Sequence, residues 1–215
     1  MARLSKNNGG TARNPDRTRA RIIAAALKEF SAHGFAGARV DAIARSAAIN
    51  KRMLYHYFGD KEALFRAVLR RKIIEQQAWA EASSGEPEET LPFWFNAACK
   101  DADWVRLLEW EALQGNPEKP LDQKKRRVAV ERSIDRVRQR QARGQLSAEF
   151  DARHLVLAMR SLTMFPIAFP QLTRFIMGRP VTDPKFQQGR VEFLRQFASA
   201  LRPAQAIPVK INFKK

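Results

Sequence analysis

The stretch that decides the fold runs from residue 34 to residue 65 and reads GFAGARVDAIARSAAINKRMLYHYFGDKEALF. Apolar residues at helical spacing predict a short helix over residues 40–47. A tight break follows, and Asn50 is a favourable N-cap for a second helix over residues 51–58. Two short helices joined by a tight turn form a helix-turn-helix, whose second helix can lie in the major groove of DNA.

The second of these helices carries an unusual set of side chains for an element of a protein core. Lys51 and Arg52 occupy its first turn, which is the part of a recognition helix that reaches base edges. Arginine can grip guanine through two acceptors, lysine can do so less rigidly, and Met53 can touch a thymine methyl group. The alternative interpretation is a solvated surface for the polar residues, with Leu54 and Phe58 in the core.

The whole stretch resembles the DNA-binding domain of TetR-family transcriptional regulators. The resemblance begins at G-F (residues 34–35) and continues through V-D-x-I-A (residues 40–44). It extends through N-K-x-x-L-Y-H-Y-F (residues 50–58) to D-K-E-x-L-F (residues 60–65). It covers about residues 15–70, and beyond them only the general layout agrees.

The resemblance implies a role for each polar residue of the second helix. Tyr55, His56 and Tyr57 match family positions that touch phosphates, so they would position the helix rather than read the sequence. Lys61 matches a lysine at the start of the next helix that contacts the DNA backbone in the family. With this resemblance, DNA contact is favoured over a solvated surface for the polar residues of the second helix.

The chain departs from the family pattern at two positions of this stretch. Arg39 stands where the family usually has Ser or Thr, so the helix cap is lost although a cation can still reach phosphate. Ala48 stands where the family prefers Gly, and alanine tolerates a positive φ at a cost of about 1 kcal/mol. The arginines of residues 13–21 could reach the minor groove or flanking phosphates, or could belong to a solubilising tail.

The charge balance of the chain is strongly basic. The net charge is +17, the isoelectric point is near 10.9, and residues 1–72 alone carry a net charge of +11. Such a balance indicates a polyanionic partner, which is either nucleic acid or an anionic membrane surface. Cys99 is the only cysteine, and we find neither a signal sequence nor a run of 18 apolar residues. We therefore expect a cytoplasmic protein that does not enter a membrane.

The rest of the chain also has the periodicity of helices, which predicts an all-α fold. It comprises an N-terminal three-helix helix-turn-helix domain for DNA binding and a C-terminal helical domain for ligand binding and dimerisation. Pro166 and Pro170 lie inside one apolar stretch and predict a kink or a split there. The predicted parts are a disordered basic tail (1–13), the DNA-binding domain (14–60), the helical domain (61–202) and a second basic tail (203–215).

Aromatic residues crowd two adjacent predicted helices of the C-terminal half around Cys99. Core packing explains each of them singly, but the resemblance implies that the corresponding helices surround an effector pocket with apolar walls and a few polar groups. Polar groups available to such a pocket are Asn96, Arg106, Glu109, Gln141, Arg160 and Thr163. The predicted ligand-binding set is Trp94, Asn96, Trp104, Arg106, Leu108, Trp110, Met159 and Thr163.

The last two predicted helices carry more apolar residues than one small domain needs. The resemblance assigns them to a four-helix dimer interface with two helices from each chain, in which residues near the two-fold axis meet their own copies. Some members of the set must pack within one chain. The predicted set is Leu155, Met159, Leu162, Phe193, Phe197 and Leu201.

No cluster of residues in the sequence points to catalysis. His33, His56 and His154 are not spaced as metal ligands, and no Ser, Cys or His has a base and an orienting group nearby in sequence. We expect a DNA-binding regulator without a cofactor, a metal or an enzymatic activity. Its partners would be a palindromic double-stranded operator, a second copy and a small-molecule effector. The alternatives are a DNA-binding structural or protein-interaction factor without an effector, and a helical enzyme.

Overall fold

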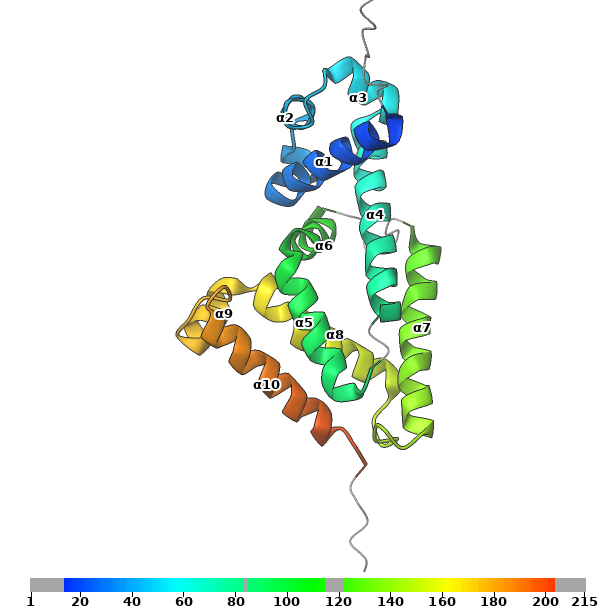
Figure 1. Cartoon of the computed structure of the whole chain (residues 1–215), viewed down its shortest axis with the longest axis vertical. Coiled ribbons are helices and arrows are strands. Elements are labelled where there is room, and N and C mark those ends of the chain that lie inside the picture. The colour runs from blue at the N-terminus through cyan, green and yellow to red at the C-terminus, as the bar shows by residue number, and fades with distance from the viewer. Residues whose placement is uncertain (1–13, 83–84, 115–121, 204–215) are drawn as a thin grey trace, which may run out of the picture. The chain divides into compact units, whose positions relative to one another are not determined.

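Helices make up every regular element of residues 14–82, 85–114 and 122–203, which are the residues described by the computed structural model (Figure 1). This confirms the predicted all-α class. The chain divides into two compact units, with the boundary between Arg71 and Lys72. The helices of the described residues are α1 (Pro15–Gly37), α2 (Val40–Ser46), α3 (Lys51–Phe58), α4 (Lys61–Ala82), α5 (Pro87–Lys100), α6 (Ala102–Gln114), α7 (Gln123–Ala142), α8 (Ala152–Ala168), α9 (Pro170–Met177) and α10 (Pro184–Ala200).

The first unit is built around the start of α1 and the apolar stripe that follows it. The Asn14 side chain accepts hydrogen bonds from two backbone N–H groups of the first turn, and Pro15 occupies the first helical position. Gly34 interrupts the helix with φ 67°, a conformation that glycine adopts without a Cβ clash. The ring of the fully buried Phe30 meets that of Phe65 edge to face, with 5.0 Å between centroids. The largest fully buried side chains of this unit are Ile22, Phe30, Ile43, Leu54, Leu64, Val68 and Leu69.

The boundary between the units falls inside α4 rather than at the predicted position after residue 60. The Asp60 carboxylate accepts the Ala63 N–H at 2.7 Å and so caps this helix. Leu64 and Val68, on the first two turns of α4, are buried in the first unit. Because those turns complete the hydrophobic core of the helix-turn-helix, the compact unit extends beyond residue 60. The predicted tail over residues 1–13, and all but the first residue of the one over 203–215, lie outside the described residues.

In the second unit, α5 packs against α10 and α8, while α7 and α6 pack against α8 (Figure 1). Two clusters of buried side chains hold these helices together. One joins α5 to α10 through Leu91, Phe95, Phe186, Leu194 and Ala198. The other joins α7 to α8 and to the end of α10 through Ile134, Val137, Leu146, Ala152, Leu155, Val156 and Leu201.

The two prolines of the apolar stretch have different effects. α8 continues through Pro166 to Ala168, and a new helix begins at Pro170, so the predicted split is confirmed at the second proline. Pro166 has no N–H to donate to the Leu162 carbonyl, and Arg190 donates to that oxygen instead, at 2.7 Å. No single helix of the described residues combines the length and apolarity of a membrane span; α8 and α9 do so only together, and they are bent by 92°.

A buried ion pair fastens α4 to the turn between α5 and α6 within the second unit. The Lys72 ammonium donates to both carboxylate oxygens of Asp101, at 2.8 and 2.9 Å, and to Glu75 at 3.0 Å. The Lys72 and Asp101 side chains are only 10% and 11% exposed. Burial by itself lowers the pKa of Lys72, but the hydrogen bonds to the two carboxylates outweigh it and raise that pKa, so the amine stays charged.

Candidate functional site

Helix α3 presents one apolar face to the first unit's core and one polar face to solvent. The Asn50 side chain accepts the Met53 N–H at 2.7 Å, which confirms the predicted N-cap. Leu54 and Phe58 are buried, as predicted for core residues. The polar face consists of Lys51, Arg52, Tyr55 and His56, all of which are exposed, while Met53 and Tyr57 are half-buried at its edges. The helix therefore offers polar and aromatic groups on the face that does not pack.

The two cations at the start of α3 differ in how they are held. The Lys51 ammonium forms an exposed ion pair with Asp41 of α2, with 3.1 Å between nitrogen and oxygen. Among the described residues, the Arg52 side chain forms no hydrogen bond or ion pair. Such exposed pairs contribute about 0–1 kcal/mol, so DNA could draw Lys51 away at little cost. Arg52 needs no such exchange before its guanidinium can meet a base.

The two predicted backbone contacts outside α3 lie on neighbouring elements of the first unit. The Lys61 ammonium donates to the Ala36 carbonyl at 3.2 Å and lies 5.0 Å from the centre of the Phe35 ring. Arg39 makes no side-chain cap at the start of α2, as its departure from Ser or Thr implies. Its backbone N–H donates to the Glu29 carboxylate at 2.9 Å, and its side chain is exposed.

Two arginines of α1 bind groups of their own unit. Arg21 donates to the carbonyl oxygens of Ala47 and Ala48 in the turn between α2 and α3, the latter at 3.1 Å. Arg19 stacks on the Phe58 ring, 4.5 Å from its centre, and donates to the carbonyl of Tyr57 at 3.3 Å. Sequence patterns did not reveal this role, because no spacing within α1 shows which of its residues face the turn.

Ala48 has φ 50°, the left-handed conformation that its place in the turn predicts. Replacing it by Gly should increase the free energy of unfolding by about 1 kcal/mol, because the Cβ strain disappears. Urea denaturation of Ala48→Gly measures this change. The matched control is Ala47→Gly, since Ala47 is buried with φ −79° and the same substitution there should destabilise the protein. A loss of stability in both variants would contradict a strained turn.

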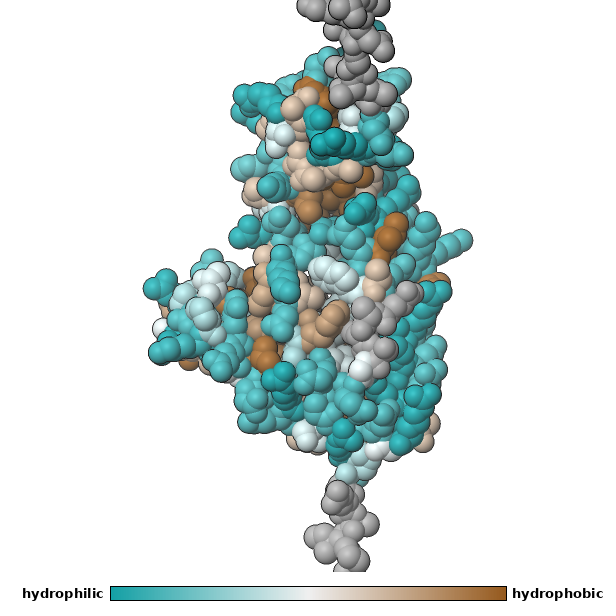
Figure 2. All heavy atoms as spheres, in the orientation of Figure 1, coloured by the Kyte–Doolittle hydropathy of each residue, from teal (hydrophilic) through white to brown (hydrophobic). Residues whose placement is uncertain are grey.

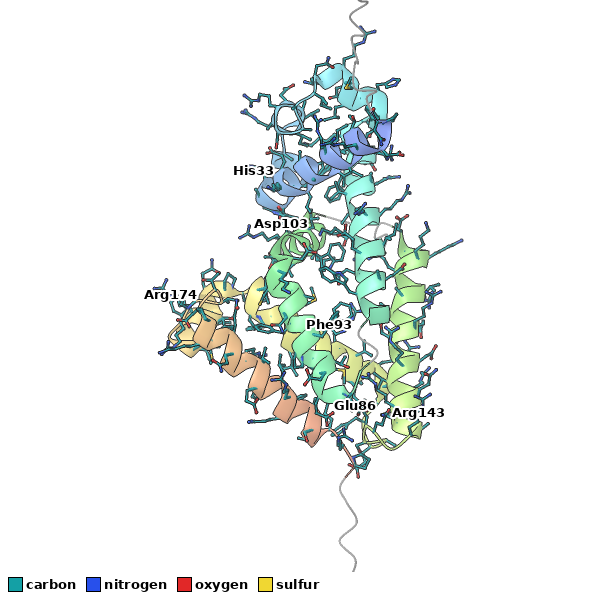
Figure 3. The ribbon with its side chains drawn as sticks, in the orientation of Figure 1. His33, Glu86, Phe93, Asp103, Arg143 and Arg174 are labelled. Atoms are coloured by element: carbon teal, nitrogen blue, oxygen red, sulfur yellow. The ribbon has the colours of Figure 1, made fainter. Side chains whose placement is uncertain are left out.

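The second unit contains a cavity of about 300 Å³ between the C-terminal half of α4 and helices α5, α6, α7 and α8. The predicted residues Trp94, Trp104, Leu108, Met159 and Thr163 line it. The side chains that these helices direct toward one another can be followed in Figure 3. The predicted cavity between the aromatic helices and the helix of Met159 and Thr163 is therefore present.

Three residues of the predicted ligand-binding set lie outside the cavity lining. Asn96 and Arg106 are exposed, and Trp110 is half-buried away from it. The reason is helical phase, because a two-residue step turns a side chain about 200° around the axis. Asn96 is two residues from the lining residue Trp94, and Trp110 is two from Leu108. Of the other polar groups considered, Glu109 is not in the lining, and Gln141 donates to the carbonyls of Ser147 and Phe150 at 2.9 and 2.7 Å.

Four arginines that sequence reasoning did not assign to the cavity also line it. They lie on α7, whose outer face is largely hydrophilic (Figure 2). The sequence contains a signal for their position, because helical periodicity places these arginines on the same face of the helix as the apolar residues Val130 and Val137. The α7 residues of the lining are Arg126, Ala129, Val130, Arg132, Ser133, Arg136, Val137 and Arg140.

A helix-turn-helix with an exposed basic and aromatic second helix, next in sequence to a helical unit with a cavity, defines a DNA-binding regulator. Known proteins identify the family. Residues 22–68 match the model of bacterial regulatory proteins of the TetR family, and residues 93–198 match a tetracycline repressor-like C-terminal domain. The chain belongs to the TetR family and is a DNA-binding transcriptional regulator.

Individual relatives share most of the chain or its N-terminal part. The HTH-type transcriptional repressor SCO4008 of Streptomyces coelicolor is 32% identical over 78% of this chain and 87% of its own length. The HTH-type transcriptional repressor NicS of Pseudomonas putida is 34% identical over 51% of this chain and 55% of its own length. The solved structure of SCO4942 from Streptomyces coelicolor superposes with a TM-score of 0.72, at 28% identity over 87% of this chain and 99% of that one.

Proposed function

We propose that this regulator is a repressor that binds an inverted-repeat operator as a homodimer and leaves it when a small molecule enters the cavity. The observation that carries the DNA part is the exposed face of α3, on which Arg52, Tyr55 and His56 stand away from the core. Repression is favoured because the relatives SCO4008 and NicS are transcriptional repressors. Arg39, Lys51, Arg52, Met53, Tyr55, His56, Tyr57 and Lys61 are the proposed DNA contacts.

Base reading and phosphate contact are assigned to different residues, and substitutions separate the two roles. Arg52→Ala should relax base preference at one operator position by about 1–3 kcal/mol, because a two-acceptor contact to guanine is lost. Tyr55→Phe, which removes only a hydroxyl, should weaken binding to all sequences alike. Binding to a panel of single-base operator variants measures both effects, with the exposed Arg174→Ala of α9 as control. Uniform loss from Arg52→Ala would remove this residue from the base-reading role.

The dimer is proposed to form through exposed apolar residues of α8 and α10. Leu157 is 62% exposed, Phe165 39% and Phe193 44%, although all three are large and apolar. Beside them, Arg190 lies 5.0 Å from the Phe193 ring centre. A second copy could supply the missing apolar contacts. We expect an interface of about 2,000 Å² or more in total, the size typical of obligate dimers.

This proposal changes the membership of the predicted interface set. Leu155 and Leu201 are buried in their own chain's core, so they are not available to a partner. Met159, Leu162 and Phe197 are only partly buried and pack against the same clusters. On α8, the face with Leu155 and Met159 turns inward, which leaves Leu157 outward. Of the predicted residues, Phe193 has the strongest case as an interface residue.

The cavity supports an effector-responsive regulator over a DNA-binding factor without an effector. Its volume of about 300 Å³ lies at the lower end of the range typical of small-molecule sites. An effector that binds better to a conformation with a different spacing of the two recognition helices would lower operator affinity by that difference. We further propose that the protein acts in the cytoplasm, where its DNA is, and has no catalytic activity.

A further inference from the structure

The cavity of the second unit is lined by an unusual excess of positive charge. Five arginines contribute to its wall, and none of the described residues that line it is acidic. These arginines are Arg126, Arg132, Arg136, Arg140 and Arg160. A purely apolar ligand would not neutralise the positive charge of these arginines, so the cavity wall favours a ligand that carries a negatively charged group.

Two of the arginines are already held by other groups. Arg126 donates to both carboxylate oxygens of Glu111, at 2.6 and 2.8 Å. Arg140 donates to the hydroxyl of Thr90 at 3.1 Å and to the carbonyl of Gly85. Desolvation and the nearby charge of Arg136 lower the pKa of Arg140. The guanidinium groups of Arg126 and Arg140 are therefore already hydrogen-bonded within the protein, and their role in the cavity wall is structural.

Arg160 of α8 is in the opposite situation. Among the described residues, its side chain has no hydrogen bond and no ion pair. Protein atoms surround its guanidinium closely enough to desolvate it and, with the charges of Arg136 and Arg126, to lower its pKa. Arg160 is nevertheless classed as exposed and lines the cavity, so its side chain is accessible to a ligand. Arginine stays protonated in proteins, so Arg160 is an uncompensated cation inside a cavity.

Arg136 of α7 lines the same cavity, close enough for its charge to act on Arg160, and has little compensation of its own. Among the described residues, its guanidinium donates one hydrogen bond, to the hydroxyl of Ser133 at 3.1 Å, and that acceptor carries no charge. The two guanidinium groups therefore repel each other in surroundings poorer in water than the surface. An anion between them would remove the repulsion and accept paired N–H bonds from planar donors.

The remaining wall is apolar and aromatic. Trp94, Trp104, Leu108 and Met159 line the same cavity, together with Ile73 and Val105. Flat indole rings and aliphatic side chains suit a planar or chain-like hydrocarbon body. The charged and the apolar parts of the cavity wall together suit an amphipathic ligand, which has an anionic group at one end and an apolar body at the other.

We infer that the cavity binds an amphipathic anion, with an apolar body against the tryptophans and a carboxylate, sulfonate or phosphate group between Arg160 and Arg136. The inference rests on the proposed effector function, since it names the chemical class of the effector. It also makes Arg160 and Arg136 residues that determine ligand specificity. Neutral apolar molecules of the same shape should bind much more weakly.

Two fluorescent probes that differ only in the anionic group test this. 8-Anilinonaphthalene-1-sulfonate and N-phenyl-1-naphthylamine share one aromatic body, and only the first carries a sulfonate. The protein should bind the sulfonate at least about 10-fold more tightly, and Arg160→Gln should lower that affinity about 10- to 100-fold. Binding of the neutral probe should change less than about 2-fold. Arg136→Gln should act in the same direction, which keeps the test available if one variant does not fold.

Controls separate this site from other apolar surfaces and from the regulatory role. Arg174→Gln, on the exposed side of α9 (Figure 3), should leave the affinity for both probes unchanged. Equal affinity for the two probes, or an unchanged sulfonate affinity in both cavity variants, would overturn the inference. If the sulfonate binds through Arg160 but does not alter operator affinity, the anion site stands and the proposed effector function is contradicted.

Discussion

Phe193→Asp is expected to convert the protein into a folded monomer and to lower operator affinity about 10²- to 10⁴-fold, the factor gained when two sites bind together. Phe193 is 44% exposed on α10, so the single chain loses little packing from the change. In a two-fold interface, each aspartate would lie in an apolar contact near its own copy. Sedimentation velocity gives the oligomeric state, and fluorescence anisotropy with a labelled operator gives the affinity.

The control for this variant places the same charge on another exposed apolar residue of the second unit. Val128 is 52% exposed on α7, away from α8 and α10 in sequence, and Val128→Asp should remain dimeric and bind the operator normally. Circular dichroism shows whether both variants keep their helices. A dimeric, DNA-binding Phe193→Asp protein would refute the assignment of α8 and α10 to the interface.

Lys72→Met is expected to lower the free energy of unfolding by about 3–5 kcal/mol, because it leaves a buried carboxylate without its cation. The carboxylate is Asp101, whose side chain is 11% exposed and receives two hydrogen bonds from Lys72. Desolvation already raises the pKa of Asp101, and the hydrogen bonds and the charge of Lys72 are what oppose that rise. Urea denaturation followed by circular dichroism measures the loss.

An exposed ion pair of the same unit supplies the comparison. Arg138 and Asp135 lie one helical turn apart on α7, and the distance between the guanidinium nitrogen and the carboxylate oxygen is 3.2 Å. Their side chains are 54% and 58% exposed. Arg138→Met should cost less than about 0.5 kcal/mol, because solvent screens such a pair. Similar losses in Lys72→Met and Arg138→Met would mean that the pair of Lys72 and Asp101 does not hold α4 in place.

Local signals in the sequence were sufficient for the helix-turn-helix and for several helix ends. Asn50 caps α3, and Pro170 begins α9, because each effect depends on the residue's own backbone or on groups within a few positions. The strained φ of Ala48 was also predictable, since the turn requires a left-handed residue whatever packs around it. The assignment of Leu54 and Phe58 to the core followed from helical periodicity alone.

Features that depend on how helices face each other could not be obtained in that way. The aromatic cluster predicts the cavity, but the sequence does not show the rotation of α5 and α6, which turns Asn96 and Arg106 away from the cavity lining. Periodicity predicts an interface role for Leu155 but does not show which neighbour covers its apolar face, and that neighbour is the core of its own chain. The uncompensated state of Arg160 depends on α7 and α8 together, so it becomes visible only when both helices are in place.

The central claim is that two copies of α3 read an inverted repeat in successive major grooves. Selection of bound sequences from a random double-stranded DNA pool tests it most directly. The expected result is one palindromic motif, with half-sites about one helical turn or a multiple apart, and binding that weakens steeply with salt. The selected motif should lose preference at one position of each half-site when Arg52→Ala is used. A pool that shows no motif, or a motif without two-fold symmetry, would contradict the claim.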